Sequence, residues 1–199
     1  MFEKFETSHS VVEAALARAY NVPDKAIGAF RARVGLLQKR GLFGAKNMPG
    51  RGKALSYGAD QFHRLVFACE LVEFGVAPSV VLDLIKARWE RRIAEIFQRA
   101  EKAAMRDPSD DDIVLHMGGV QLMAYALVDT VPNVNSCPLR KLPDNIRMWM
   151  TMEPDDPAGL PPRALIVNLS MRLRAFHRAL VVSDKLSAER RAAKARGGK

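Results

Sequence analysis

The chain has 199 residues, of which 48% are hydrophobic and 27% charged, a composition typical of a folded protein and not of a disordered one. Its net charge of +9 favours a polyanionic partner, with nucleic acid as the first candidate and an anionic membrane surface as the second. No apolar run approaches the ~20 residues that span a bilayer, and the first ten residues lack the apolar core of a signal peptide. Two cysteines, Cys69 and Cys137, suggest neither a disulfide framework nor a zinc site, so we expect a cytoplasmic, nucleoid-associated protein.

The positive charge is concentrated in one segment of the chain. Residues 24–53 contain eight basic residues and one acidic residue, a net charge of +7. Residues 107–183 contain seven basic and nine acidic residues, a net charge of −2. A local concentration of this kind predicts a binding surface for a polyanion and not a diffuse field around the whole molecule.

The first half of the chain has the pattern of a series of helices. Helix-start signals, glycine breaks and apolar periodicity predict helices over residues 10–20, 24–40, 59–74 and 78–105. Gly41 and Gly75 suit the ends of the second and third helices. Residues 44–56 are rich in Gly, Lys and Arg, and Pro49-Gly50 predicts a hairpin or an extended loop there.

The second helix is the strongest candidate for a DNA-contacting element. Ile27, Phe30, Val34 and Leu37 form one apolar stripe, which predicts that they pack inward. The opposite side carries bases mixed with small residues, a pattern that lets a helix backbone approach a phosphate wall. We expect DNA contacts from its basic residues, with Lys25 on phosphate and Arg31 either on DNA or paired with an acid at the core edge: Lys25, Arg31, Arg33, Lys39 and Arg40.

The basic loop after this helix is a second candidate contact. Lys46, Arg51 and Lys53 would hold the DNA backbone or the minor groove, which positions a protein without reading sequence. Tyr57, at the end of the loop, is as well suited to packing as to DNA contact.

The helix predicted over residues 78–105 carries a seven-residue apolar repeat. Leu82, Trp89 and Ile96 recur at this spacing, and Ile93 and Ala100 occupy the interleaved position. Such a stripe on a long helix predicts a two-fold homodimer through Leu82, Trp89, Ile93, Ile96 and Ala100, with packing against the chain's own C-terminal part as the alternative.

The second half of the chain predicts a small α+β module over residues 107–183. Asp107 to Asp112 is a polar stretch that suggests a domain boundary. Alternating apolar residues over 146–152 predict a half-buried strand, residues 164–167 a second strand, and the residues after Asn168 a helix. The basic tail, residues 184–199, has too little apolar content to fold alone, so we expect it to be disordered.

The order of these elements resembles that of the MerR-like winged helix-turn-helix regulators. Leu36 to Leu42 (LLQKRGL) is similar to the end of the family's recognition helix, and Arg51 to Tyr57 (RGKALSY) to its wing. Phe62 follows at the family's spacing, and Gly75 to Ile85 (GVAPSVVLDLI) resembles the segment that leads into its dimerisation helix. The resemblance covers residues 11–97.

The resemblance implies a winged helix-turn-helix DNA-binding domain over residues 1–77 and a dimerisation helix over residues 78–106. The sequence departs from the family at the first turn of the recognition helix, where the usual arginine is replaced by Gly35 or displaced to Arg31 or Arg33. The cysteines of the metal-sensing branch are absent, which argues against metal sensing.

These patterns together predict a mainly helical, sequence-specific double-stranded DNA-binding regulator of transcription that acts as a homodimer. An excisionase-like factor that bends DNA and an adaptor that uses the same scaffold for protein contacts are the alternatives. No histidine, cysteine or carboxylate pattern predicts an enzyme, a metal site or a cofactor. Residues 107–183 are expected to bind a protein or small-molecule effector.

Overall fold

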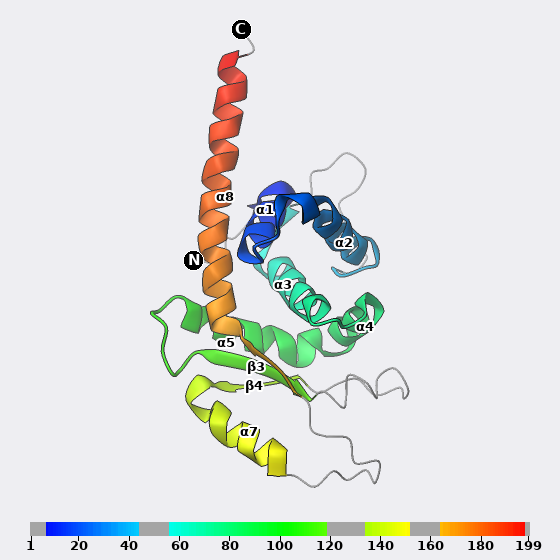
Figure 1. The fold of residues 1–199 in the computed structure, drawn as a ribbon, viewed down its shortest axis with the longest axis vertical. Coiled ribbons are helices and arrows are strands. Elements are labelled where there is room, and N and C mark those ends of the chain that lie inside the picture. Colours follow the sequence, from blue (N-terminus) through cyan, green and yellow to red (C-terminus); the bar gives the residue numbers. More distant parts are fainter. Residues whose placement is uncertain (1–6, 44–55, 119–133, 152–163, 198–199) are drawn as a thin grey trace. The chain divides into compact units, whose positions relative to one another are not determined.

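The computed structural model describes residues 7–43, 56–118, 134–151 and 164–197 (Figure 1). The described part is mainly helical, with one two-stranded and one three-stranded sheet, as the sequence predicted in outline. The chain divides into two compact units: unit 1 comprises residues 1–70 and 175–199, and unit 2 comprises residues 71–174. Both divisions fall inside helices, so the units differ from the predicted domains 1–77, 78–106, 107–183 and 184–199.

Unit 1 is built from helices and one short two-stranded sheet. Its elements are β1 (Thr7–Ser8), α1 (His9–Ala19), the 3-10 turn η2 (Asp24–Ala26), α2 (Ile27–Lys39), β2 (Ser56–Tyr57), most of α3 (Ala59–Glu73) and the later part of α8 (Leu169–Gly197). β1 and β2 pair antiparallel, with Thr7 opposite Tyr57. The helices predicted over residues 10–20 and 59–74 are confirmed to within one residue, and the helix predicted over residues 24–40 begins three residues later, after η2.

The ends of α1 and α2 follow from residues that tolerate a left-handed backbone. Gly41 has a φ of 96° just after α2, and Asn21 has a φ of 49° just after α1. In each case two backbone amides close the last turn, as when Leu42 N–H donates to the Leu37 carbonyl at 3.2 Å. The sharp turn after α1 makes α1 and α2 neighbouring helices.

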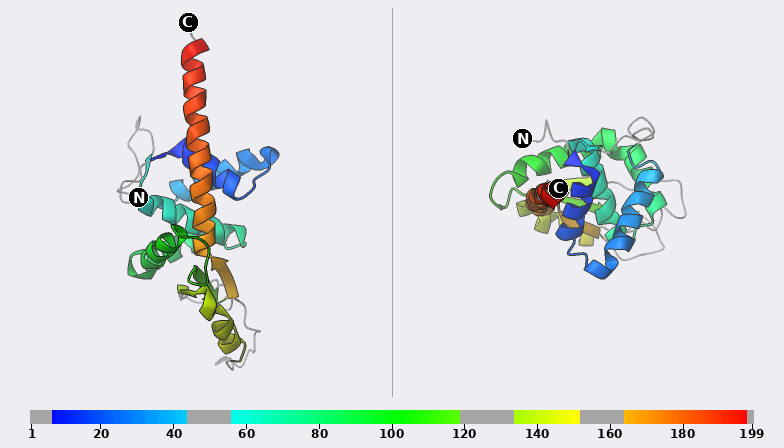
Figure 2. Two further views of the ribbon diagram at one scale, coloured as in Figure 1. Left: turned by 90° about the vertical axis from the view of Figure 1, so that its left-hand side faces the viewer. Right: turned by 90° about the horizontal axis from the view of Figure 1, so that it is seen from above.

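Aromatic side chains connect the helices in the core of unit 1. Phe176 of α8 lies with its ring centroid 5.4 Å from Tyr20 and 6.1 Å from Phe62, in edge-on geometry. The Tyr20 hydroxyl donates a 2.9 Å hydrogen bond to Glu70. The later part of α8 therefore completes a core that the first 70 residues begin, and it continues past α1 toward the C-terminus (Figures 1 and 2).

Unit 2 combines helices with an antiparallel sheet. It contains α4 (Pro78–Arg88), the π-helical turn η4 (Trp89–Ile93), α5 (Ala94–Ala104), β3 (Ile113–Gly118), β4 (Val134–Pro138), the 3-10 turn η5 (Leu139–Lys141), α7 (Leu142–Thr151), β5 (Ala164–Asn168) and the start of α8. The strand order is β4-β3-β5, with Leu115 opposite Ser136 on one side and Val167 on the other. The predicted strand at residues 164–167 and the helix that follows it are confirmed.

One buried ion pair links the end of α5, the start of β3 and α8. Arg174 donates to both carboxylate oxygens of Asp112, at 2.6 and 2.7 Å. Its remaining donors reach the carbonyl oxygens of Ala103, Arg106 and Asp107, which lie at and beyond the C-terminal end of α5. The carboxylate is 3% exposed and the guanidinium side chain 10%. Of the predicted linker over residues 107–112, Asp112 is buried and residues 107–111 are exposed, and the whole segment lies inside unit 2 and not at a division between the two units.

Two other predictions for the second half of the chain are wrong. Residues 142–151 form helix α7, not the strand expected over residues 146–152, of which Met152 lies outside the described residues. Pro143 and Asp144 stand in the first turn, where both residue types favour a helix, and Ile146 and Met148 are exposed instead of alternating into a core. The tail is helical to Gly197, because α8 propagates from residues that Leu173, Phe176 and Leu180 anchor.

The Arg174–Asp112 pair predicts a specific acid sensitivity. Its hydrogen bonds to Arg174 hold the pKa of Asp112 below the ordinary value. A depressed pKa in the folded state stabilises the protein above about pH 4, and this contribution is lost as the pH falls through the folded pKa. Asp112→Asn should lower the free energy of unfolding by about 3–5 kcal/mol at pH 7, because it leaves Arg174 buried without its counter-charge.

Denaturant unfolding at neutral and acid pH, followed by circular dichroism, measures both effects. Asp144→Asn is the matched control, because Asp144 is 79% exposed and pairs only loosely with Arg147 at 3.9 Å. Equal losses in the two variants would contradict the assigned role of Asp112.

Candidate nucleic-acid interface

The buried stripe of α2 fixes which of its residues face outward. Phe30, Val34 and Leu37 are between 1% and 7% exposed, and the Phe30 ring lies 6.2 Å from Tyr20. Gln38 is also buried, and its side-chain amide donates to the Tyr57 hydroxyl. The inward packing predicted for this stripe is confirmed, and Ile27 lies at its half-buried start.

The outward face of α2 carries bases beside small residues. Lys25, Arg33, Lys39 and Arg40 are all exposed, as are Gly28, Ala29 and Ala32 on the same side of the helix. Within the described part of the chain, neither Lys39 nor Arg40 forms an ion pair. The face is therefore positively charged, and it has small side chains in its first half and the exposed Leu36 among the bases of its second half.

The two glycines of α2 are not explained by the packing of the chain. A Cβ atom added at Gly28 or Gly35 would meet no atom of the described residues within 4 Å. Glycine inside a helix costs roughly 0.5–1 kcal/mol relative to alanine, so these positions carry a cost that no internal contact offsets. Close approach of a partner to this face would account for them.

Arg31 lies apart from this face. Its Nε is 3.9 Å from a carboxylate oxygen of Glu13 on α1, and the side chain is 58% exposed. The alternative that Arg31 pairs with an acid at the core edge is therefore the one that the structure supports.

Tyr57 is part of the core and not a contact residue. Its side chain is fully buried, and its ring lies 5.5 Å from Phe43 and 5.7 Å from His9. Burial, with smaller contributions from Glu13 and Cys69, raises the pKa of Tyr57 well above its ordinary value. The predicted DNA contact at this residue is wrong, and the packing alternative holds. Lys46, Arg51 and Lys53 lie outside the described residues.

The predicted dimer interface is buried inside a single chain. Trp89, Ile93, Ile96 and Ala100 are at most 4% exposed, Leu82 is half-buried, and α5 packs against β3 of the same unit. The prediction is wrong because the core of the same unit buries these side chains, and the π-helical turn η4 also divides the predicted single helix into α4 and α5. The packing alternative is therefore correct, and this repeat supports no dimer.

No sequence pattern indicated the hydrogen bonds that Arg174 forms in unit 2. Arg174 and Asp112 are 62 positions apart, and no local pattern pairs them. Other site types find little support in the described ranges. No three His, Cys, Asp or Glu side chains gather there as metal ligands, and no described helix has the length and apolar content of a membrane span.

Comparison with known proteins finds no relative of this chain. No family model, curated protein or solved structure significantly matches the chain. The resemblance to MerR-like regulators therefore stays a prediction from the sequence.

The open face of α2 predicts that its glycines can be replaced with a gain in stability. Gly28→Ala and Gly35→Ala should each raise the free energy of unfolding by about 0.5–1 kcal/mol, because alanine restricts the unfolded chain and meets no atom in the folded one. Thermal unfolding measures the change. Gly41→Ala is the matched control and should destabilise, since Gly41 has a φ of 96°. A loss of stability at Gly35 similar to that at Gly41 would show that the face is not open.

Proposed function

We propose that the chain binds double-stranded DNA through the outward face of α2 and regulates transcription. The observation that carries this proposal is the outward face of α2, on which the exposed small residues Gly28, Ala29 and Ala32 are followed by the exposed bases Arg33, Lys39 and Arg40. The major groove of DNA admits an α-helix, and lysine and arginine side chains at the edges of such a helix reach phosphates and guanine edges.

The surroundings of α2 support the same function. α1 and α2 are consecutive helices joined by a tight turn, the arrangement in which a second helix enters the groove while the first supports it. β2 directly follows the basic loop in sequence, where a winged helix has its wing, and it pairs antiparallel with β1, which precedes α1. The MerR-like resemblance implies the same use of these elements.

The proposal concerns a single chain. The apolar repeat that predicted a homodimer is buried, so no part of the DNA-binding argument depends on a partner helix at residues 82–100. An effector bound to residues 107–183 stays a prediction without a contact that supports it.

Removal of the positive charge from α2 should weaken DNA binding and reduce its sensitivity to salt. The triple variant Arg33→Ala, Lys39→Ala, Arg40→Ala should bind a mixed-sequence duplex at least tenfold more weakly. Each phosphate contact contributes about −0.9 to the slope of log affinity against log salt concentration, so the slope should become shallower by up to about 3. Fluorescence anisotropy with a labelled duplex, between about 50 and 200 mM salt, measures both quantities.

The control removes the same amount of charge from unit 2. Lys86, Arg99 and Lys102 are exposed on α4 and α5, and their triple alanine variant should keep the affinity and slope of the unmodified protein. Equal effects of the two triple variants would show that DNA binding depends only on net charge, and this result would contradict a site on α2.

A further inference from the structure

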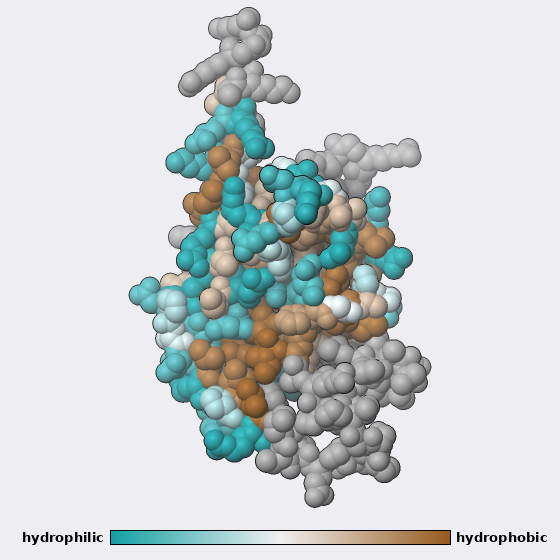
Figure 3. All heavy atoms as spheres, viewed as in Figure 1, coloured by the Kyte–Doolittle hydropathy of each residue, from teal (hydrophilic) through white to brown (hydrophobic). Residues whose placement is uncertain are grey.

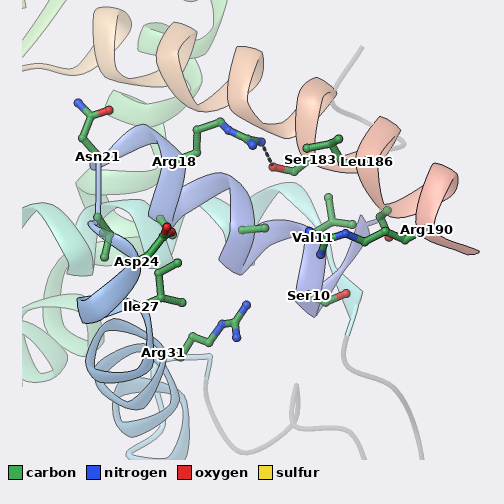
Figure 4. Close-up of a pocket in the computed structure, with 14 residues that line it drawn as sticks. Ser10, Val11, Arg18, Asn21, Asp24, Ile27, Arg31, Ser183, Leu186 and Arg190 are labelled. Carbon is green, nitrogen blue, oxygen red and sulfur yellow. Dashed lines mark hydrogen bonds between the residues drawn. The ribbon is translucent and has the colours of Figure 1, made fainter.

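Unit 1 contains a groove of about 640 Å³ that the DNA-binding argument does not use (Figure 4). α1 forms its floor, the later part of α8 forms one wall, and η2 with the start of α2 forms the other. The volume falls within the range of sites that hold small molecules.

The hollow follows from the sequence of α1. Ser10, Ala14, Ala17 and Asn21 recur at three- and four-residue spacing, so one side of the helix carries mostly short side chains. α8 and α2 are held on either side of α1 by their own buried contacts, such as those of Phe176 and Phe30 with Tyr20. Short side chains between two fixed walls leave a space that no side chain of the described residues fills.

Three arginines from three helices line this groove against a single acid. Figure 4 shows Arg18 of α1, Arg31 of α2 and Arg190 of α8 around the hollow, with Asp24 as the acidic lining residue. Arg18 donates a 3.1 Å hydrogen bond to the Ser183 hydroxyl, and Arg31 has its partner Glu13 at 3.9 Å. Arg190 forms no ion pair within the described part of the chain. Guanidinium donors therefore exceed the acceptors around them.

The rest of the lining is apolar or carries hydroxyl groups. Ile27 and Leu186 present aliphatic surface, and Leu186 is 38% exposed although it is a large apolar residue. Leu186 belongs to an exposed apolar run on α8 that includes Val181 and Val182, and Figure 3 shows apolar patches on this part of the helix. Aliphatic surface beside guanidinium groups suits a ligand with an apolar body and an anionic head.

We propose that this groove binds a small amphipathic anion, a carboxylate or a phosphate monoester with an apolar tail. The anionic head contacts Arg18, Arg31 and Arg190, and the tail covers Ile27 and Leu186. The site lies in unit 1 and, of residues 107–183, where the sequence predicted an effector, it includes Ser183 at its edge. Its existence does not depend on DNA binding, because none of its residues belongs to the outward face of α2.

Calorimetric titration of the full chain with octanoate and with octyl phosphate tests the proposal, with octanamide as the uncharged comparison. Both anions should bind, added salt should weaken them, and octanamide should bind at least tenfold more weakly. Arg190→Ala and Arg18→Ala should each reduce the affinity for octanoate by roughly tenfold, the usual effect of losing a hydrogen bond to a charged group. Lys185→Ala, an exposed change on α8 outside the groove, should leave affinity unchanged.

Arg190 is exposed, so its variant should fold even if loss of the Arg18–Ser183 hydrogen bond destabilises the other. Equal binding of octanamide and octanoate, absence of binding by both anions, or an equal loss in Lys185→Ala would overturn the proposal. So would displacement of octanoate by a DNA duplex together with weaker duplex binding by Arg190→Ala, since the groove would then belong to the DNA surface. The titrations contain no DNA unless it is added, so this test and the test of DNA binding can fail separately.

Discussion

Phe30, Val34 and Leu37 occupy one side of α2, and their burial determines where the other residues of this helix lie. Once these side chains pack inward, the helical period places Gly28, Ala29 and Ala32 on the opposite side and Arg33, Lys39 and Arg40 beside them. The Gln38–Tyr57 hydrogen bond adds a directional constraint, because a rotation of α2 would leave two polar groups buried without a partner. The orientation of the basic face is thus a consequence of core packing.

Helix α8 has a different role in each half of its length. Near its start, Arg174 satisfies the carbonyl oxygens at the end of α5 and neutralises Asp112, which belongs to unit 2. A few residues later, Phe176 packs against Tyr20 and Phe62 in unit 1. Farther along, Ser183 and Arg190 line the groove beside α1. Leu186 and Arg190, which belong to the predicted disordered tail, therefore line this groove.

Periodicity and chain-stopping residues predicted the first half of the fold well. The apolar spacing of α2, together with Gly41 and Gly75, gave the helix boundaries, because both signals depend only on neighbouring residues. Predictions were wrong where the decisive contact joins residues that are distant in the sequence. The seven-residue repeat around Trp89 is present in the sequence, but its side chains are buried within the same chain, and a π-helical turn begins at Trp89.

The candidate site was predictable in part for the same reason. The outward position of Lys39 and Arg40 follows from local periodicity, whereas the pairing of Arg31 with Glu13 and the burial of Tyr57 depend on how α1, α2 and β2 meet. The groove required α8 to lie beside α1, although Arg18 and Arg190 are far apart in the sequence. Nothing in the sequence alone brings these two arginines together.

The proposed contact between α2 and DNA is tested most directly through the methyl groups of the alanines in α2. The account predicts that addition of a DNA duplex shifts or broadens the methyl NMR signals of Ala29 and Ala32, which are exposed on the outward face. The signals of the buried Ala15 and of Ala77, exposed elsewhere, should stay in place. Unchanged signals from Ala29 and Ala32 at a duplex concentration that saturates binding would contradict the central claim.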